Sequence, residues 1–413
     1  MLDIKFIREN CQLVEKGAKD KGVPIDLGNL LEVDEKRRQL LQEVENLRAQ
    51  RNKIAQEKNI EKGKELKEKI RKIEDELEKI NERFHDLMLQ VPMPAASDVS
   101  VGKTEDENVQ VKSWGKLPKF DFAPKDYITL MEDLDLLDLE RGAKIGGFRQ
   151  YVLKNEAVLF EQALIKLSID QLRKKGFTLL RPTIMVKESA MVGSGMFPKG
   201  KEDTYQTDDG YLAGTTEVPL MAYHADEILT EKDLPKKYVG FSQAFRKEVG
   251  SYGKDVKGIF RIHEFWQTEQ VVICKNDEKE SIGWHEELLK NPEEFVQDLG
   301  LPYRVVNCCT GDLSDGQVKR YDIEIWVPSQ GKYRETHSDS YLFDFQTRRL
   351  NIRYKTKSGE IKFAHSLNST GVAVPRILIP LLENYQQKDG SVKVPDVLQK
   401  FVGIERIVPK RNL

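Results

Sequence analysis

Cysteine is scarce in this sequence, which has four cysteines among 413 residues: Cys11, Cys274, Cys308 and Cys309. Because no C-x-x-C pair is present, neither a zinc site nor a disulfide framework is expected, and a reducing cytoplasm is the expected location. Long apolar runs are also missing, so we expect no membrane span. Residues 1–6 carry too much charge for a secretory signal.

An excess of charge of one sign is absent too. The 66 Lys and Arg residues nearly balance the 68 Asp and Glu residues, and the formal net charge is -2. The chain is therefore not a general nucleic-acid binder, and any RNA contact must come from a local basic patch. The absence of a G-x-x-x-x-G-K-[S/T] loop argues against a P-loop ATPase. Apolar residues make up 39% of the chain, enough for a core, and its length indicates two or three domains.

Residues 27–91 have the pattern of a long helical hairpin. Apolar residues recur at steps of three and four, which is the heptad spacing of a coiled coil. The first limb carries Val33, Leu40, Val44, Leu47 and Ile54, and the second carries Leu66, Ile70, Ile73, Leu77, Ile80, Phe84 and Leu87. Arg37 and Arg51 take the two intervening seam positions. A break at residues 59–63 predicts the turn, and each limb would span roughly 40 Å.

The outer half of this hairpin is basic. Its Lys and Arg residues include Arg48, Arg51, Lys53, Lys58, Lys62 and Lys64. Such charges most often form the solvated face of a coiled coil, but a cluster of this kind also fits an arm that holds RNA phosphates. The residues alone leave both interpretations open.

The character of the sequence changes after the hairpin. We place an N-terminal domain at residues 1–100, a linker interrupted by Pro and Gly at 101–125, and a second domain at 126–413. In the second domain, β-branched and aromatic runs mix with amphipathic helices without a regular βαβ period. We predict an α/β (α+β) domain centred on an antiparallel sheet. Strands are expected at 151–153, 238–241, 270–274, 304–308, 321–327 and 351–354, and helices at 157–175 and 374–385.

Two distant segments, FRKE at 245–248 and GVAVPR at 371–376, place an arginine among apolar residues. An arginine keeps its charge at ordinary pH, and its planar fork matches a pair of phosphate oxygens. Arg246 and Arg376 therefore suggest one shared polyanion site, with ATP as the candidate ligand. For either segment by itself, an unrelated surface salt bridge is the alternative.

The residues around these arginines resemble motifs 2 and 3 of the class II aminoacyl-tRNA synthetases, and the whole set is most similar to the seryl-tRNA synthetase family. The supporting segments are TTEVPL at 215–220, FRKEVGSYGKD at 245–255, RIHEF at 261–265, CTGD at 309–312, YDIEIW at 321–326, DFQTRR at 344–349 and LENYQQ at 382–387. The likeness runs from residue 1 to about residue 403, far more than one short motif. It implies a long antiparallel coiled-coil hairpin followed by a class II catalytic domain, an antiparallel sheet flanked by helices.

The resemblance implies an ATP site. Its residues would be Arg246, Glu248, Arg261, Phe265, Glu335, Ser338 and Arg376. Arg246 would bridge the α-phosphate and the amino-acid carboxylate, and Arg376 would hold the γ-phosphate. Glu335, with Ser338 beside it, would bind Mg²⁺ together with the phosphates. Arg261 would contact the triphosphate, Phe265 would stack on adenine, and Glu248 would lie near the adenine amino group. If residues 246–248 form an extended strand, Glu248 shares a face with Arg246. The expected catalytic residues are Arg246, Glu335 and Arg376.

The resemblance also implies a serine site. Its residues would be Thr215, Glu217, Arg246, Glu269, Asn368 and Thr370. Glu269 would accept from the serine hydroxyl and ammonium, and Thr370 matches the position where the family has Ser or Thr at the substrate hydroxyl. A polar pocket of this kind rejects alanine, because its buried groups would be left unpaired.

Partners follow from the same resemblance. The arm residues Arg48, Arg51, Lys53, Lys58, Lys62 and Lys64 are implied to grip tRNA(Ser). Residues 175–182 resemble motif 1, the element through which this class forms homodimers. By themselves, residues 175–182 predict only a helix that ends at Gly176 and a strand that ends at Pro182.

Two segments depart from the family pattern. Residues 336–341 carry His337 where the family usually has serine, and residues 266–268 (WQT) replace a usual charged pair. A histidine at this position either alters metal or ATP contacts or belongs to the core, and the core is the more common place for such a residue.

The expected activity is that of a serine–tRNA ligase. Serine and ATP would give seryl-adenylate and pyrophosphate, and the seryl group would move to the 3′ end of tRNA(Ser), with tRNA(Sec) as a further candidate acceptor. The expected cofactors are ATP and Mg²⁺. One alternative is a relative with another amino acid or acceptor, which would tend to lack the arm and to carry zinc-ligand cysteines. The other is a regulatory RNA-binding paralogue, which would have lost a motif arginine or Glu335.

Overall fold

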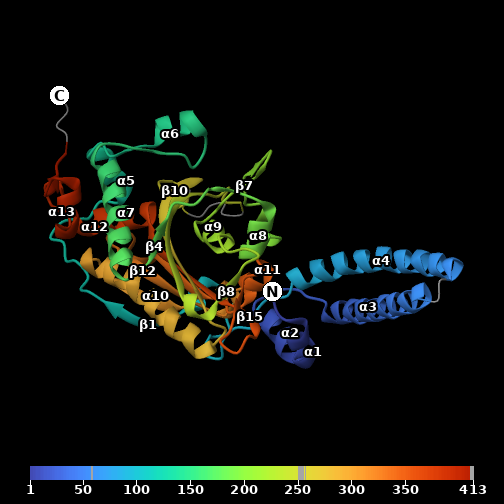
Figure 1. Cartoon of the computed structure of the whole chain (residues 1–413). Helices are drawn as coiled ribbons and strands as arrows, with labels where there is room; N and C mark the ends of the chain where they lie inside the picture. Colours follow the sequence, from blue (N-terminus) through green and yellow to red (C-terminus); the bar gives the residue numbers. More distant parts are fainter. Residues whose placement is uncertain (57–58, 250–254, 256, 410–413) are drawn as a thin grey trace. The chain divides into compact units, whose positions relative to one another are not determined.

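The computed structural model describes residues 1–56, 59–249, 255 and 257–409. The chain forms two compact units, Met1–Pro94 and Ala95–Leu413 (Figure 1). Within these described ranges, no helix combines the length and the apolar character that a bilayer crossing requires.

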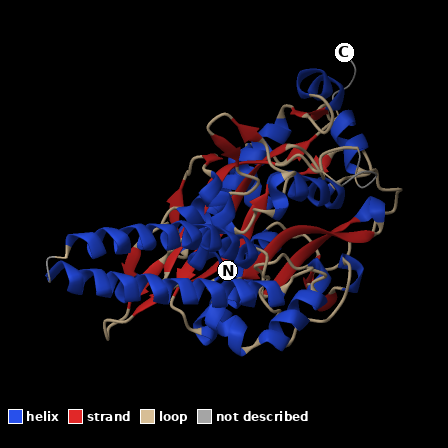
Figure 2. Ribbon diagram, turned by 90° about the vertical axis from the view of Figure 1, so that its right-hand side faces the viewer, coloured by secondary structure: helices blue, strands red, loops and turns tan. Residues whose placement is uncertain are grey.

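The first unit is helical. Its elements are α1 (Ile4–Glu9), α2 (Cys11–Asp20), α3 (Leu27–Gln56) and α4 (Ile60–Leu89). The two long helices lie side by side as a hairpin (Figure 2). The residues buried between them are Leu40, Val44, Leu47, Ile70 and Ile73, with Leu66, Leu77 and Ile80 partly buried. The predicted heptad seam is therefore confirmed.

Arg37 takes the place of an apolar residue in this seam. Its guanidinium lies 4.6 Å from the centre of the Phe84 ring, and its Nε donates to Asn81 Oδ1 at 2.9 Å. Because the stem of an arginine covers apolar surface while the head reaches polar partners, the seam continues through this position. Arg51, the other predicted seam arginine, is exposed.

Helix α4 begins inside the range that was predicted to form the turn of the hairpin. Asn59 is the N-cap of α4, and its side chain accepts from the backbone N–H of Lys62 at 3.2 Å. The helix begins at Ile60, so Gly63 lies inside it. The predicted break near residues 59–63 is correct at Asn59 and wrong for residues 60–63, because a capping asparagine starts a helix that the later glycine does not interrupt.

An eight-stranded sheet forms the centre of the second unit (Figure 1). Its order is β1-β11-β12-β13-β16-β10-β9-β4, and neighbouring strands are antiparallel except for the parallel pair β4 and β9. The strands are β1 (Val109–Trp114), β4 (Thr178–Leu180), β9 (Lys236–Phe245), β10 (Glu264–Cys274), β11 (Tyr303–Asn307), β12 (Lys319–Val327), β13 (Lys332–Tyr341) and β16 (His365–Ala373). The predicted antiparallel-centred fold is confirmed.

Helices cover the two faces of this sheet. One face packs against α7 (Glu156–Lys174), α10 (Glu278–Asp298) and α12 (Val374–Tyr385). Thr268 of β10 points to this face, since its Oγ1 lies 2.7 Å from Ser168 Oγ of α7. Gln267 and Glu269 therefore alternate to the opposite face. That side carries α8 (Glu188–Ser194), α9 (Glu217–Ala222) and α11 (Phe345–Arg349).

Shorter elements complete the unit. The helices are α5 (Tyr127–Asp133), α6 (Leu139–Gly146) and α13 (Asp396–Val402). The strands are β2 (Leu137–Asp138), β3 (Val152–Leu153), β5 (Met185–Val186), β6 (Gln206–Thr207), β7 (Gly210–Leu212), β8 (Ile228–Thr230), β14 (Arg353–Lys355), β15 (Ile361–Phe363), β17 (Val392–Lys393) and β18 (Arg406–Ile407).

The predicted elements agree with most of these bounds. Helix α12 has the predicted limits, α7 differs by one residue at each end, and each predicted strand overlaps an observed one. Helix α10 and strands β13 and β16 were not predicted. Strand β1 lies inside the range 101–125, which was predicted to be a linker, and pairs with β11.

Candidate active site

A cavity of about 300 Å³ lies beside β10, β13 and β16, at the first turn of α12. The predicted site residues that line it are Arg246, Glu248, Arg261, Phe265, Glu335, Ser338, Thr370 and Arg376. These residues come from four separate stretches of the sequence. The structure thus brings the two arginine-bearing segments, 245–248 and 371–376, to one site.

A bulge in β13 turns Glu335 and Ser338 to the same side. Two successive residues of β12 pair with Glu335 and His337, so Thr336 is an extra residue of β13. In a regular strand, residues three apart point to opposite faces. The extra residue brings Ser338 onto the side of Glu335, and both line the cavity.

A second bulge shapes β16. Two successive residues of β10 pair with Val372 and Thr370, so Gly371 is the extra residue. A Cβ at Gly371 would lie 2.4 Å from Thr268 Oγ1, so this close approach requires glycine. The bulge sets Thr370 and Ala373 together at the cavity.

Arg376 and Glu335 form an ion pair in this cavity. Arg376 Nη1 lies 3.0 Å from Glu335 Oε2. Burial opposes ionisation of Glu335, but the charges of Arg376 and Arg320 outweigh burial and hold its pKa below the ordinary value. Glu335 is therefore a carboxylate at neutral pH, with oxygen atoms of the kind that Mg²⁺ prefers.

Arg246 brings a second arginine charge to the cavity. Its Nε donates to Gly214 O at 2.9 Å, and its guanidinium lies 5.4 Å from the centre of the Phe265 ring. Burial and the charge of Arg376 lower the pKa of Arg246, although a guanidinium stays cationic in a protein. Two guanidinium groups that repel each other in one cavity suit a bound polyanion.

The backbone of Glu248 differs from the predicted extended conformation, although its side chain lines the cavity. Strand β9 ends at Phe245, and Glu248 has a backbone φ of 55°. The prediction of an extended strand through residue 248 was wrong, because this residue adopts the left-handed conformation of a turn. Its side chain nevertheless lines the cavity and accepts from Arg261 Nη1 at 3.3 Å. Residues 250–254 of the same motif lie outside the described residues.

A polar pocket adjoins the cavity next to Thr370. Glu269 pairs directly with Thr370 across β10 and β16 and is 4% exposed. Glu217, the first residue of α9, accepts at Oε1 from Asn368 Nδ2 at 2.8 Å. Thr215 belongs to the same pocket, because its Oγ1 accepts at 3.0 Å from Gln267, which lines the cavity. The residues predicted for the serine site therefore gather in one place.

The two carboxyl groups of this pocket hold protons more tightly than ordinary glutamates. Burial raises the pKa of Glu217 to about 7, although a hydrogen bond from Gln346 and the charge of Arg246 oppose the rise. Burial and the nearby Glu217 raise the pKa of Glu269 well above its ordinary value. A cationic ligand would favour the ionised form of both.

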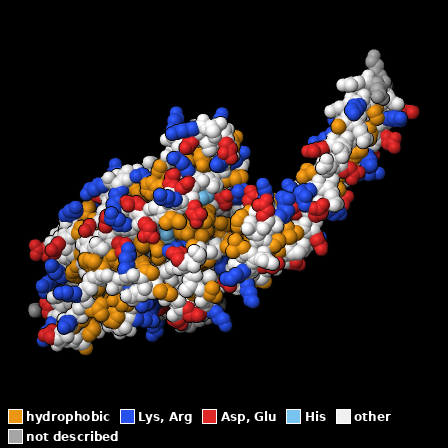
Figure 3. All heavy atoms as spheres, turned by 90° about the horizontal axis from the view of Figure 1, so that it is seen from below, with side chains coloured by type: hydrophobic (Ala, Val, Ile, Leu, Met, Phe, Trp, Pro, Cys, Tyr) orange, Lys and Arg blue, Asp and Glu red, His pale blue; other side chains and the backbone are white. Residues whose placement is uncertain are grey.

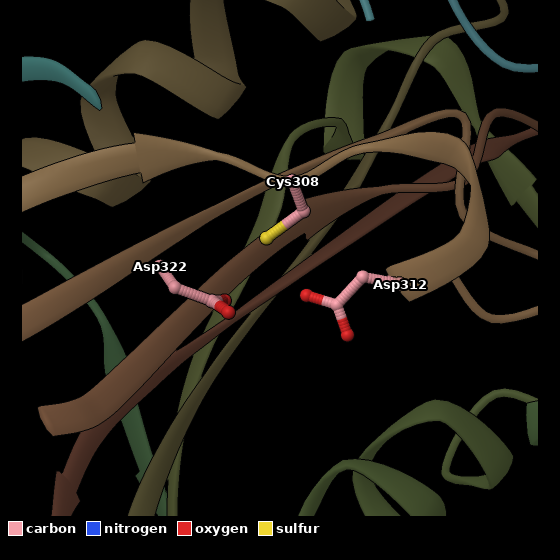
Figure 4. A group of neighbouring side chains, drawn as sticks. All are labelled: Cys308, Asp312 and Asp322. Atoms are coloured by element: carbon pink, nitrogen blue, oxygen red, sulfur yellow. The ribbon is translucent and has the colours of Figure 1, made fainter. Parts of the chain in front are cut away.

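Cys308, Asp312 and Asp322 converge beside the cavity (Figure 4). The guanidinium of Arg320 joins them: Nη2 lies 2.6 Å from Asp312 Oδ2 and 2.9 Å from Asp322 Oδ2, and Nε lies 3.2 Å from Cys308 Sγ. Burial raises the pKa of the Cys308 thiol, so this sulfur keeps its proton. A protonated thiol and an arginine at the carboxylates do not suit a metal ion.

His337 faces away from the cavity into the core. It is 1% exposed, its Nδ1 lies 2.9 Å from Thr336 Oγ1, and its ring meets Phe295 of α10 edge to face. Burial lowers the pKa of His337 to about 3, so it is neutral. Of the two interpretations of this departure from the family pattern, the geometry favours the core histidine.

Several residues that line the cavity were missed in the sequence. Phe260 lies under Arg376, with 5.0 Å between the guanidinium and the ring centre, and Asp312 and Arg320 form another wall. Asp312 stood in the quoted CTGD segment, which was the available signal. Glu105 also lines the cavity, and nothing in its polar surroundings distinguished it.

The basic residues predicted to bind tRNA lie on the helical hairpin. Arg48, Arg51, Lys53, Lys62 and Lys64 are exposed, and Lys58 lies outside the described residues. Arg48 Nη2 is 2.6 Å from Glu74 Oε1 of the other helix. On the face drawn in Figure 3, basic and acidic side chains are interspersed along the hairpin.

Comparison with known proteins adds to this geometry. A model of the tRNA synthetase class II core domain (G, H, P, S and T) matches residues 201–385, and the seryl-tRNA synthetase N-terminal domain matches residues 1–94. The serine–tRNA ligase of Deinococcus radiodurans is 45% identical over 415 residues, which cover 98% of each chain. The serine–tRNA ligase of Treponema denticola is 40% identical and covers 98% of this chain and 100% of its own.

Solved structures agree. Seryl-tRNA synthetase from Pyrococcus horikoshii complexed with ATP is similar with a TM-score of 0.93 and 40% identity, over 100% of both chains. Cytoplasmic serine–tRNA ligase from Naegleria fowleri in complex with AMP has a TM-score of 0.90 and 34% identity, over 100% of this chain and 99% of that one. The fold is that of a class II aminoacyl-tRNA synthetase. Within that class, the chain belongs to the seryl-tRNA synthetase family, as its motifs predicted.

Proposed function

We propose that this protein activates L-serine with ATP and transfers the seryl group to the 3′ end of tRNA(Ser). The observation that carries the proposal is the meeting of Arg246, Glu335 and Arg376 in one cavity, next to the buried carboxyl groups of Glu217 and Glu269. The cavity suits a polyanion, and the adjoining pocket suits a small ligand with a cationic group. The relatives are named serine–tRNA ligases, and this supports the same activity for the present chain.

In the proposed complex, ATP lies along the arginines. Arg246 contacts the α-phosphate and the serine carboxylate, so both reactants meet at one guanidinium. Phe265 stacks on adenine, Glu248 lies near its amino group, and Arg261 contacts the triphosphate. Arg376 exchanges Glu335 for the γ-phosphate. Charge that develops at the α-phosphorus is then stabilised by groups already in place.

Magnesium fits the same arrangement. Glu335 is ionised, and Ser338 is turned to its side by the bulge at Thr336. These oxygen donors would hold Mg²⁺ together with the phosphates, and the ion would neutralise phosphate charge when bound. When Arg376 turns to the phosphates, Glu335 would lose its cationic partner, and the bound ion would balance the charge of this carboxylate.

Serine is proposed to bind where Glu217 and Glu269 meet Thr370. Its ammonium would pair with the two carboxylates, and its hydroxyl would exchange hydrogen bonds with Glu269 and Thr370. Asn368 and Thr215 hold the walls of the pocket through hydrogen bonds to Glu217 and Gln267. A ligand without the hydroxyl would leave buried polar groups unpaired, which is the basis of discrimination against alanine.

The remaining partners are part of the proposal. The exposed arm residues Arg51, Lys53, Lys62 and Lys64 would contact phosphates of tRNA. A second copy of the chain would pair at residues 175–182, where Leu179 of the edge strand β4 is 42% exposed. The proposed location is the cytoplasm. Whether tRNA(Sec) is also charged is decided by the experiment below.

The direct test of the acceptor is aminoacylation. Purified full-length protein is incubated with ATP, Mg²⁺ and labelled serine, with transcripts of tRNA(Ser), tRNA(Sec) and an unrelated tRNA in separate reactions. We expect charging of tRNA(Ser) and none of the unrelated tRNA. Adenylate formation without transfer to any tRNA would support a different acceptor.

A further inference from the structure

Gln346 of α11 is a fully buried amide outside the residues predicted for the site. Both of its N–H donors are used: Nε2 donates to Glu217 Oε1 at 2.6 Å and to Ser194 O at 2.9 Å. Its carbonyl oxygen accepts from Ser366 Oγ at 2.8 Å. The amide therefore connects α8, α9 and β16 behind the polar pocket.

These partners fix which way the amide faces. Ser194 O can only accept, and a rotated amide would set its oxygen against this carbonyl and against the carboxylate of Glu217. The same rotation would leave Ser366 facing an NH₂ group. One orientation thus satisfies all three partners, and it turns an N–H toward Glu217.

The carboxyl group of Glu217 is held from one side. Gln346 and Asn368 both donate to Oε1, at 2.6 Å and 2.8 Å. A carboxylate that receives two N–H groups on one oxygen has its plane and rotation fixed, while the other oxygen stays available to a ligand. Gln346 touches neither the cavity nor any proposed substrate position.

We propose that Gln346 is the positioning residue of the amino-acid pocket: it holds Glu217 through Oε1 and so presents Oε2 to the ammonium group of the bound amino acid. The proposal rests on the proposed function, because it needs a substrate with an ammonium group. Asn368 alone would leave the carboxylate free to rotate about a single hydrogen bond.

The charged groups around Glu217 make this role measurable. Arg246, which follows β9, and the hydrogen bond from Gln346 lower the pKa of Glu217 against the effect of burial, and Glu269 of β10 faces it as a second carboxyl group. Loss of the Gln346 amide removes one of the two interactions that lower the pKa of Glu217 against the effect of burial. The pocket then needs a higher pH to reach its anionic form.

The test is ATP–pyrophosphate exchange by full-length Gln346→Met, which keeps the side-chain length and removes the donor. We expect the KM for serine to rise by about tenfold to a hundredfold, as for the loss of a hydrogen bond to a charged group, while the KM for ATP changes less than about twofold. The matched control is Gln386→Met, since buried Gln386 also donates twice, to Lys125 O and Glu383 O, and accepts once, from Lys125 N. It should lose stability without a change in serine KM.

Two further variants separate positioning from general damage. Ser366→Ala removes only the hydroxyl that orients the amide and should raise the serine KM by about threefold to tenfold. Gln346→Glu faces Glu217 with a second carboxyl group, so its serine KM should be near the parent value at pH 6, where the pair shares a proton, and should rise steeply by pH 8.

The proposal is overturned if Gln346→Met and Ser366→Ala keep the parent KM for serine, or if Gln386→Met raises it equally. If Gln346→Met does not fold, Ser366→Ala and the pH dependence of Gln346→Glu decide the matter. A parent protein without serine-dependent exchange would instead contradict the proposed function, which is a different result.

Discussion

Arg376 Nη1 lies 3.0 Å from Glu335 Oε2, so the two residues proposed to hold the γ-phosphate and its metal ion neutralise each other before any ligand arrives. ATP must separate this pair to reach Arg376, and the carboxylate it displaces then faces the phosphates. A cation that binds to Glu335 at the same time removes this repulsion. The binding of ATP and the binding of Mg²⁺ are therefore expected to be coupled.

The first prediction concerns this coupling. In Glu335→Gln, ATP should bind about tenfold more tightly than to the parent in EDTA, because the competing carboxylate is gone, and more weakly with Mg²⁺ present. Calorimetric titration in both conditions measures the two affinities. The control is Glu105→Gln, which removes a carboxylate elsewhere in the cavity wall. It should not change the ATP affinities in EDTA and in Mg²⁺ in opposite directions. Equal changes with and without Mg²⁺ would contradict the coupling.

The second prediction concerns pH and serine. The pKa of Glu217 is raised to about 7, so below pH 7 this group is protonated in the empty pocket and loses its attraction for an ammonium. The KM for serine should rise by about fivefold from pH 7 to 6 and level off above pH 8, while the KM for ATP stays flat. Exchange kinetics across this range give both constants.

The matched variant for this experiment is Glu217→Gln, which cannot titrate. Its KM for serine should be higher than that of the parent at pH 8 and should change less between pH 7 and 6, with Glu269 as the remaining titratable group of the pocket. A parent protein with a flat profile, or a Glu217→Gln variant that keeps the slope, would assign the pocket charge to another residue.

The third prediction separates two neighbours in β13. His337 packs in the core, so His337→Ala should cost about 2–4 kcal/mol of stability and leave the KM for ATP within about twofold. Ser338 lines the cavity, so Ser338→Ala should raise the KM for ATP with little change in melting temperature. Thermal unfolding and exchange kinetics on the two variants test this, and a large ATP effect at His337 would reverse its assignment.

Features that depend on a local sequence pattern could be predicted, whereas features that depend on pairing with a distant strand could not. Heptad spacing is a local pattern, and Leu40 or Ile73 falls in the seam as that pattern requires. Arg246 and Arg376 were found because arginine among apolar residues is conspicuous. The extra residues Thr336 and Gly371 were not found, because a bulge depends on pairing with another strand.

Other site residues were hidden for similar reasons. Glu248 takes a positive φ at the end of a strand, which no residue preference foretells for glutamate. Glu105 comes from a segment without periodicity and reaches the cavity through tertiary structure. Gln346 stood in a quoted motif, but its role depends on three partners that are 20 to 152 positions away in the chain.

The fourth prediction concerns the arm. Replacement of Arg51, Lys53, Lys62 and Lys64 by Ala keeps the helices, because Ala is the best helix former. The KM for tRNA(Ser) should rise at least about tenfold, and its salt dependence should flatten, because phosphate contacts are lost. Serine-dependent exchange should stay at the parent level, since the cavity is unchanged.

The control for the arm removes four exposed lysines of the second unit instead: Lys116, Lys119, Lys232 and Lys357. It should leave the KM for tRNA near the parent value. If the arm variant charges tRNA as well as the parent does, its basic residues are the solvated face of a coiled coil.

The central claim is that the cavity of Arg246, Glu335 and Arg376 activates serine. ATP–pyrophosphate exchange by the full-length protein across a panel of amino acids, with Arg246→Ala in parallel, tests it most directly. We predict exchange with serine, little with threonine or alanine, and a loss of about 100-fold to 1,000-fold in folded Arg246→Ala, the cost of one preorganised contact to the developing charge. Exchange that prefers another amino acid, or a folded Arg246→Ala with near-parent activity, would contradict the claim.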